Sequence, residues 1–174
     1  MRRTAIHEAG HAVAAEVLRL GCGGLNIIPN REEAAAGHCI FPIGEYEVLA
    51  AWEARGRQSG RNWARSAGRA ATIAILAGVA AEREVLGRAG PGAGSDRCVA
   101  ALLVDDLTPT DEDVRATLRR LERATAGLVS RHRNAIAAVS EELERRKQLS
   151  GSEVASIIAA ARASGPGVHL RGSM

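Results

Sequence analysis

Apolar residues recur at helical spacing near the start of the chain and define its first expected element. From Ala5 to Leu20 they occupy positions 6, 9, 13, 17 and 20, which lie on one face of an α-helix. Thr4 is the expected N-cap, because its hydroxyl can accept a backbone hydrogen bond at a helix start. Gly21 and the pair Gly23-Gly24 then end the pattern, as glycines after a helix often do.

Helical periodicity dominates the rest of the chain as well. The run from Trp63 to Leu86 contains "ATIAILAGVAAEREVL", whose middle is apolar on nearly every side and therefore predicts a buried helix. The glycine-rich segment 87–94 predicts a loop, and a helix is expected from Ser95-Asp96 to Leu103. The polar segment "RGRQSGRN" (55–62) predicts another loop. Further helices are predicted over residues 45–54, over 114–146 with a break near Gly127, and over 149–163.

Two short apolar runs interrupt the helical pattern and predict strands. "LNIIP" (25–29) is bounded by glycine and proline, and "HCIFP" (38–42) follows the turn-like segment "NREEAAAG". The expected fold class is therefore mainly α: a helical bundle with a small β-hairpin or sheet. Residues 1–163 form the expected domain, with a helical C-terminal part at about 109–163. Residues 164–174 lack a core-forming pattern and are expected to form a disordered tail.

Composition narrows the class of protein. The 174 residues suit one domain, and no run approaches the roughly 20 apolar residues of a membrane span. No signal-like segment opens the chain, and three scattered cysteines (Cys22, Cys39 and Cys98) fit reduced thiols, so a cytoplasmic protein without membrane contact is expected. All but one of the 23 basic residues are arginines, interleaved with 20 acids. Without a basic and aromatic platform, they favour a solvated surface over nucleic-acid binding.

The segment "HEAGH" (7–11) carries the strongest chemical signal. His7 and His11 are four residues apart, so on a helix they stand one turn apart on the same face and can bind one Zn²⁺ ion. Glu8 can reach a metal-bound water without binding the metal and is the expected general base. Gly10 costs a helix about 1 kcal/mol and indicates close packing on the same side, so the histidines are expected to face the interior. The alternative is two solvent-facing histidines that fall four apart by chance.

A catalytic zinc site needs a third protein ligand and one open position. The later candidates are His38, Glu82, Glu84, Asp96, His132 and His169. His169 lies in the expected tail, and His132 lies in an arginine-rich stretch typical of an exposed helix. Asp96 could equally be an ordinary acid at a helix start. Glu82 lies in an apolar helix, where a buried carboxylate needs a metal, a cation or a histidine as partner. Spacing alone does not choose between Asp96 and Glu82.

Six stretches of the chain resemble the peptidase domain of the FtsH family, the membrane-bound AAA zinc proteases. In order they are "AIHEAGHAVAAEVL", "LNIIP", "AGHCIFP", "LAGVAAEREVLG", "GAGSDRCVAALL" and "SEELERRKQLSGSEV", and they span most of residues 4–160. The resemblance implies a zincin fold of this family's type. It also implies that Asp96 is the third zinc ligand and that Glu82 orients a ligand histidine.

Several features of that family are absent from this sequence. It has no G-x-x-x-x-G-K-[ST] phosphate loop, no AAA module and no membrane anchor, and Ser95 stands where the family has asparagine. We therefore expect a zinc metalloendopeptidase that cleaves flexible or unfolded polypeptides and, as an isolated chain, does not use ATP. A separate ATPase could supply substrate, and the chain could form homo-oligomers. The alternatives are a non-catalytic adaptor that binds zinc or peptides, against which Glu8 argues, and an arginine-rich nucleic-acid-binding domain.

The segment "GHCIFP" (37–42) is the expected substrate-binding element. An exposed strand edge offers unpaired N–H and C=O groups to any extended chain. Gly37 allows close backbone approach, His38 could hydrogen-bond the substrate, and Ile40 lies in the middle of the strand. The alternative is an internal strand with a merely solvent-facing His38. Cys39 is expected to be a packing residue, because no base is paired with it in the sequence pattern.

Overall fold

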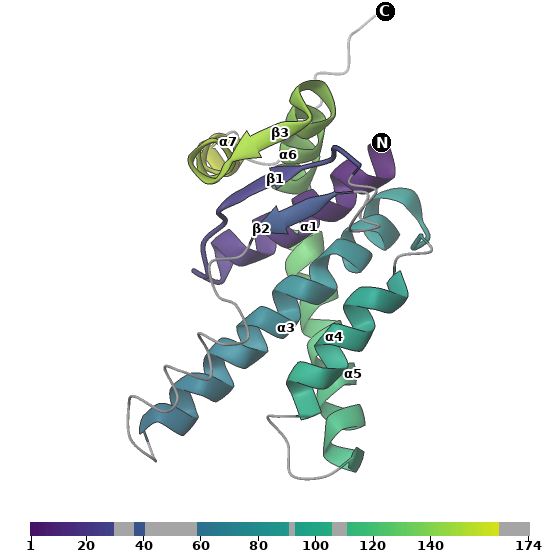
Figure 1. Cartoon of the computed structure of the whole chain (residues 1–174), viewed down its shortest axis with the longest axis vertical. Coiled ribbons are helices and arrows are strands. Elements are labelled where there is room, and N and C mark those ends of the chain that lie inside the picture. The colour runs from purple at the N-terminus through teal and green to yellow at the C-terminus, as the bar shows by residue number, and fades with distance from the viewer. Residues whose placement is uncertain (30–36, 41–58, 91–92, 106–110, 164–174) are drawn as a thin grey trace, which may run out of the picture.

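The computed structural model describes residues 1–29, 37–40, 59–90, 93–105 and 111–163, which contain six helices and three strands (Figure 1). The helices are α1 (Arg2–Val17), α3 (Ser59–Leu86), α4 (Ala93–Asp105), α5 (Asp111–Arg131), α6 (Arg133–Arg146) and α7 (Gly151–Ala163). The strands are β1 (Gly24–Asn26), β2 (His38–Ile40) and β3 (Gln148–Ser150). The fold is therefore mainly α with a small β element, as the hydrophobic pattern predicts.

The three strands form one antiparallel sheet in the order β2-β1-β3. Leu25 in β1 lies opposite Cys39 in β2 and opposite Leu149 in β3. Leu25 and Leu149 are buried in the same hydrophobic cluster as the apolar residues of α1. Among the described strands, β2 and β3 are therefore the two edges of the sheet, and one face of the sheet covers the central helix.

The central helix is α1, which packs against α3 and α6 and lies beside β1 and β2 (Figure 1). Its residues 8–15 are all buried. Small residues allow this close packing: a Cβ on Gly10 would lie 2.6 Å from the carbonyl oxygen of Ala77 and 2.7 Å from the Cβ of Ala81. The close packing inferred from Gly10 is thereby confirmed, and α3 is its cause.

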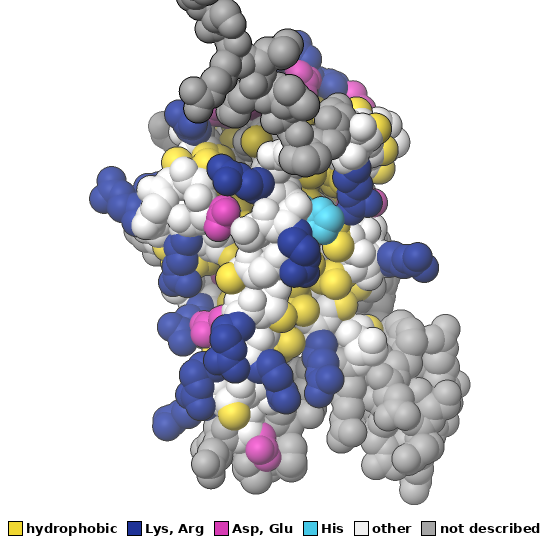
Figure 2. Space-filling model, turned by 180° about the vertical axis from the view of Figure 1, so that it is seen from behind, with side chains coloured by type: hydrophobic (Ala, Val, Ile, Leu, Met, Phe, Trp, Pro, Cys, Tyr) yellow, Lys and Arg dark blue, Asp and Glu magenta, His cyan; other side chains and the backbone are white. Residues whose placement is uncertain are grey.

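A second hydrophobic cluster lies between α3, α4 and α5. Its buried members are Leu76, Ala100, Val104, Leu118 and Leu121. Because α3 contributes to this cluster and also packs on α1, it links the first helix to α4. None of the described helices is both long enough and apolar enough to cross a lipid bilayer. On the face seen in Figure 2, Lys and Arg side chains are scattered over much of the surface, between apolar and uncharged residues.

Several element ends differ from the sequence prediction. α1 begins at Arg2, so that Thr4 lies inside the helix and is not its N-cap, and the N–H of Ala5 donates to the carbonyl of Met1 (2.9 Å). β1 is displaced towards the N-terminus relative to the predicted strand 25–29. α3 begins at Ser59, inside the predicted loop 55–62, and α4 begins before Asp96. Backbone hydrogen bonds determine where a helix or strand begins and ends. The pattern of apolar side chains predicts these positions only to within a few residues.

The C-terminal half shows two further differences. The long predicted helix breaks at His132, not near Gly127, and the N–H of His132 lies 3.1 Å from the carbonyls of both Leu128 and Val129. A glycine inside a helix costs only about 1 kcal/mol, so Gly127 does not force a break. The sequence prediction also missed β3, a three-residue strand formed by pairing with β1. The predictions for residues 45–54, 55–58, 41–42 and 164–174 lie outside the described residues.

Candidate metal centre

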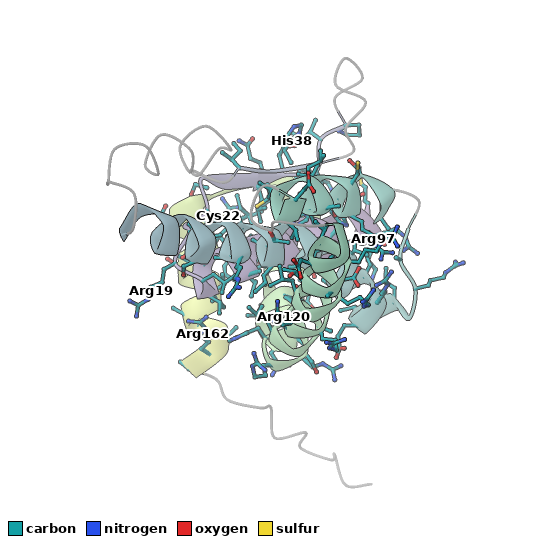
Figure 3. All side chains as sticks on the ribbon, turned by 90° about the horizontal axis from the view of Figure 1, so that it is seen from below. Arg19, Cys22, His38, Arg97, Arg120 and Arg162 are labelled. Atoms are coloured by element: carbon teal, nitrogen blue, oxygen red, sulfur yellow. The ribbon has the colours of Figure 1, made fainter. Side chains whose placement is uncertain are left out.

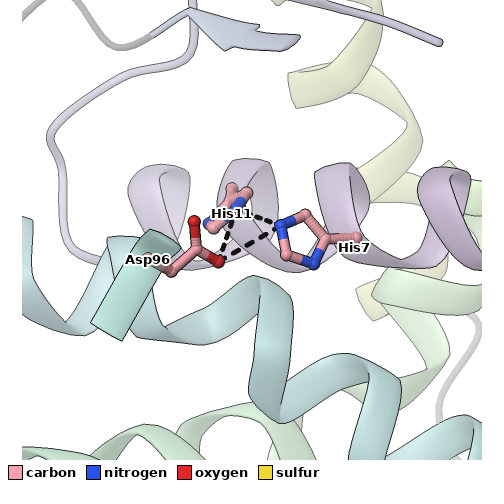
Figure 4. A group of neighbouring side chains, drawn as sticks. All are labelled: His7, His11 and Asp96. Carbon is pink, nitrogen blue, oxygen red and sulfur yellow. Dashed lines mark hydrogen bonds and ion pairs between the residues drawn. The ribbon is translucent and has the colours of Figure 1, made fainter. Parts of the chain in front are cut away.

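Three predicted ligand residues meet between α1 and α4. His7 and His11 stand one turn apart on α1, and Asp96 lies in the first turn of α4 (Figure 4). His7 Nε2 lies 3.0 Å from His11 Nε2, and Asp96 Oδ2 lies 3.2 Å from the former nitrogen and 3.6 Å from the latter. Among the described residues, this is the group of three His, Cys, Asp or Glu side chains whose atoms could hold one metal ion.

The hydrogen bonds on the far side of each imidazole determine which nitrogen faces the centre. His11 Nδ1 lies 2.8 Å from the carbonyl oxygen of Ala74, which can only accept, so Nδ1 carries the hydrogen. His7 Nδ1 likewise lies 2.8 Å from Glu82 Oε1 and donates to this carboxylate. In the neutral rings both Nε2 atoms are then unprotonated and present lone pairs, which is the arrangement that metal-binding histidines require.

These lone pairs converge on a carboxylate oxygen that lacks a hydrogen bond. Asp96 Oδ2 is buried, with no hydrogen-bond partner among the described residues. Three electron-rich atoms at such short distances repel one another unless a cation or a proton lies between them. A tetrahedral ion with bonds of about 2.0–2.2 Å has ligand atoms about 3.3–3.6 Å apart. The distances from Asp96 Oδ2, 3.2 and 3.6 Å, are close to this spacing, and the 3.0 Å between the two imidazole nitrogens is slightly shorter.

Protonation of His7 is the alternative to a bound cation. Burial opposes that proton, but the carboxylates of Asp96, Glu8 and Glu82 outweigh burial and raise the pKa of His7 to about 8. Burial and the charge on His7 lower the pKa of His11 to about 4. At neutral pH the metal-free pair thus carries one proton beyond the two on the Nδ1 atoms. This proton lies on His7 Nε2, and a metal ion has to displace it.

Glu8 lies next to this cluster but is not part of the ligand group. The residue is buried, with 7% of its surface exposed. A Cβ on Gly37 would lie 2.9 Å from Glu8 Oε1, so the carboxylate sits against the backbone just before β2. Burial raises the pKa of Glu8 to about 7. A buried carboxylate of near-neutral pKa, beside a possible metal position and a strand, is suited to accept a proton.

The glycine in the middle of α3 forms one wall of the centre. A Cβ on Gly78 would lie 2.5 Å from His11 Nε2 and 2.9 Å from His7 Cε1, which is closer than atoms of this kind approach one another. Gly78 therefore gives the two imidazoles the room to stand side by side, with their ring centroids 4.6 Å apart.

The other predicted residues fall at clearly different places. Glu82 is buried and contacts His7, whereas Glu84 is exposed and lines a separate pocket of about 210 Å³ between α3, α4 and α5. His132 is the N-cap of α6 and is not a member of the ligand group found among the described residues. His169 lies outside the described residues. The structure thus separates the open candidates by position: Asp96 faces the Nε2 atoms, and Glu82 faces an Nδ1 atom.

The predicted substrate strand is near the centre, and its side chains alternate. Gly37 lies beside Glu8, while His38 and Ile40 are exposed on β2. His38 lies at the outer margin of the molecule in Figure 3, which is compatible with a solvent-facing residue. Cys39 is half-buried and packs against the core. A hydrogen bond with Cys22 and burial raise the pKa of the Cys39 thiol well above its usual value, so it is a poor nucleophile.

Sequence reasoning missed four contributors to this centre: Arg3, Gly78, Gly90 and the carbonyl of Ala74. Arg3 donates to Glu82 Oε2 at 2.5 Å, and so does the backbone N–H of Gly90. Arg3 stands four residues before His7, and this spacing was an available signal, since it places both on one helix face. A backbone carbonyl leaves no such signal.

Comparison with protein-family models and with curated proteins finds no match for this chain.

Proposed function

We propose that this protein is a zinc-dependent metalloendopeptidase that hydrolyses peptide bonds in flexible or unfolded polypeptides. His7, His11 and Asp96 are the proposed metal ligands, and Glu8 is the proposed general base. The observation that carries the proposal is the buried Asp96 Oδ2, which has no hydrogen-bond partner among the described residues and lies 3.2–3.6 Å from two imidazole nitrogens. Glu8 follows His7 on α1, and its buried carboxyl with a pKa of about 7 suits a base.

The division of labour follows from where each side chain lies. When bound, zinc lowers the pKa of a water molecule from 15.7 to about 7 and polarises a substrate carbonyl. Glu8 accepts the proton of the attacking water and can pass it to the leaving amine, because a base of near-neutral pKa both takes and returns a proton at pH 7. Glu82 and the Ala74 carbonyl hold the Nδ1 hydrogens and keep both rings in the metal-binding orientation.

Zinc is favoured by the sequence context of the ligands. Two imidazoles and one carboxylate also suit non-haem Fe(II). The arrangement His-Glu-x-x-His on one helix, with the base next to the first ligand, is typical of zinc hydrolases. The similarity of six ordered stretches to the FtsH-family peptidase domain supports the same choice, and it supports a zincin fold. The described fold, mainly helical with a small sheet, is compatible with this.

The proposed substrate lies in extended form along β2. Within the described residues β2 is an edge of the sheet, and its N-terminal end adjoins Glu8. Ile40 is 57% exposed there, so an apolar side chain of the substrate could pack on it. Main-chain pairing would bind many sequences equally, which suits a peptidase that acts on unfolded chains.

The test combines metal analysis with hydrolysis of unfolded casein. We expect about one zinc per chain, loss of hydrolysis on chelation, and recovery on adding zinc back. Glu8→Gln is expected to keep the zinc and lose nearly all activity, because an amide cannot accept the proton. Glu84→Gln is the matched control: this exposed glutamate on α3 belongs to no ligand group, so its variant should bind zinc and cleave casein normally.

The outcomes separate the alternatives. Full activity in Glu8→Gln would exclude Glu8 as the base. Stoichiometric zinc without hydrolysis in the wild-type chain would favour the non-catalytic adaptor. Iron in place of zinc in the purified protein would argue against the proposed hydrolase.

A further inference from the structure

Arg3 links the protein surface to the metal centre. It lies in the first turn of α1, one helical turn before His7 and on the same face. Its Nη1 atom donates a 2.5 Å hydrogen bond to Glu82 Oε2 and a 3.1 Å hydrogen bond to the carbonyl of Arg88. The side chain of Arg3 is 34% exposed, whereas that of Glu82 is 4% exposed. Arg3 therefore reaches inwards to a buried carboxylate that touches a proposed ligand.

Both oxygens of Glu82 are engaged. Oε1 accepts the 2.8 Å hydrogen bond from His7 Nδ1, and Oε2 accepts from Arg3 and from the N–H of Gly90, each at 2.5 Å. The carboxylate cannot rotate without breaking one of these contacts. Because Oε2 is occupied by two donors, Oε1 stays directed at His7 and accepts the hydrogen that this ring carries on Nδ1. The other nitrogen of His7 then remains available to a metal ion.

The backbone at Gly90 connects this cluster to the helix of the third ligand. A Cβ at Gly90 would lie 2.8 Å from Arg3 Cδ and 3.0 Å from Glu82 Oε2, so this close approach requires glycine. The carbonyl of Gly90 accepts a 3.3 Å hydrogen bond from the N–H of Ala93, the first residue of α4. Since α4 carries Asp96 in its first turn, one cluster joins both ligand-bearing helices.

We propose that Arg3 is a positioning residue of the metal centre. It holds the carboxylate of Glu82 between His7 and the Gly90 backbone, and it thereby sets the ring orientation of His7 and the approach of α4. This inference rests on the proposed function, because it assigns Arg3 a role at the proposed metal site. A partly exposed ion pair adds little to stability by itself. Loss of Arg3 should therefore weaken metal binding much more than it lowers the melting temperature.

The experiment measures the zinc dissociation constant of the purified full chain by competition with a chromophoric chelator. Arg3→Met removes the guanidinium and keeps an unbranched side chain. We expect it to bind zinc about 10–100-fold more weakly than wild type, the usual effect of losing a group that orients a metal ligand. Arg145→Met is the matched control, because Arg145 pairs with Glu142 on the exposed surface of α6. Its zinc affinity should equal that of the wild-type chain.

A double-variant cycle distinguishes positioning from general destabilisation. If Arg3 acts through Glu82, adding Arg3→Met to Glu82→Gln should lower zinc affinity little beyond Glu82→Gln alone. The absorption bands of Co²⁺ bound in place of zinc should shift in Arg3→Met, because they report ligand geometry. Gly90→Ala disturbs the same cluster by a second route. Its control is Gly94→Ala, since a Cβ on Gly94 would meet nothing within 4 Å.

Three results would be decisive. Wild-type zinc affinity in Arg3→Met would overturn the role of Arg3 and leave the proposed function standing. So would a loss of zinc affinity on Arg3→Met that is as large in the Glu82→Gln background as in the wild-type chain. A wild-type chain that binds neither zinc nor Co²⁺ would overturn both. Zinc binding without hydrolysis would contradict the peptidase activity alone, and weaker binding in Arg3→Met would then still support the positioning role.

Discussion

The substitution Gly78→Ala tests the geometry of the centre most directly, because it adds one methyl group at the wall of the site. In an ordinary helix, alanine in place of glycine stabilises the fold by up to about 1 kcal/mol. At this position, the new Cβ would lie 2.5 Å from His11 Nε2 and 2.9 Å from His7 Cε1. The substitution therefore sets a small favourable effect of helix propensity against a steric clash with two proposed ligands.

The clash should outweigh the propensity. Non-bonded heavy atoms are best separated by about 3.5–4.0 Å, so the imidazole of His11 has to move by roughly 1 Å. The hydrogen bond of 2.8 Å from His11 Nδ1 to the carbonyl of Ala74 resists that movement, because Ala74 lies on α3 together with Gly78. Overpacking of this kind costs about 1–3 kcal/mol, more than the helix gains. A metal site tolerates errors of only about 0.2 Å in its ligand distances.

The assay is a zinc titration together with thermal unfolding of the metal-free chain. We expect Gly78→Ala to bind zinc about 10–100-fold more weakly than wild type, or more weakly still. Loss of a group that orients a metal ligand has an effect of this size, and displacement of the ligand itself should lower zinc affinity by no less. The metal-free variant should unfold at a lower temperature. Gly127→Ala is the control on α5, where the nearest atom to an added Cβ is Nη1, at the far end of the exposed Arg131 side chain, at 3.4 Å. That variant should be as stable as wild type, or more so, and bind zinc normally.

A specific combination of results would refute this reasoning. If Gly78→Ala keeps wild-type zinc affinity and unfolds at or above the wild-type temperature, the imidazoles do not stand against α3 as described. If Gly127→Ala weakens zinc binding as much as Gly78→Ala does, the loss reflects helix stability and not the position of the methyl group.

Two further predictions concern the sheet and the last helix. Ile40→Pro removes a backbone donor from β2 and should raise the KM for casein with zinc still bound; an unchanged KM in the folded variant would mean that substrate does not dock along β2. Hydrogen bonds from the backbone and hydroxyl of Ser150, and the nearby Arg146, lower the pKa of Glu153 from 4.5 to about 2. This group therefore stabilises the fold above its unfolded pKa, and the contribution is lost as pH falls towards 2. When the melting temperature is measured as the pH falls from 4.5 towards 2, it should decrease less steeply in Glu153→Gln than in the wild-type chain. An equally steep decrease in both chains would contradict this contribution.

The sequence alone determined the features that depend on neighbours a few residues apart. The helical repeat of apolar residues predicted most helices, because burial of one face every 3.6 residues is a local pattern. The same repeat placed His7 and His11 one turn apart on a face directed inwards, and the structure brings them together there. The cost of glycine inside a helix indicated close packing at Gly10, and α3 provides it.

Contacts between distant segments were decided only by the tertiary structure. The sequence could not choose between Glu82 and Asp96, because both are acids at plausible places. The choice depends on which side of the imidazoles each one reaches: Glu82 reaches His7 Nδ1, and Asp96 reaches both Nε2 atoms. That geometry is set by the packing of α3 and α4 around α1, to which residues far apart in the chain contribute.

The same reason explains the elements that the sequence prediction missed. β3 has only three residues and no alternating pattern of its own, and it exists because β1 pairs with it. The helix break at His132 instead of near Gly127 also leaves no local mark. On either side of it, Val129 and Ile136 are buried in the same core. Periodicity reports which residues are buried. Which partners bury them is decided by the balance of packing and hydrogen bonds in the whole fold.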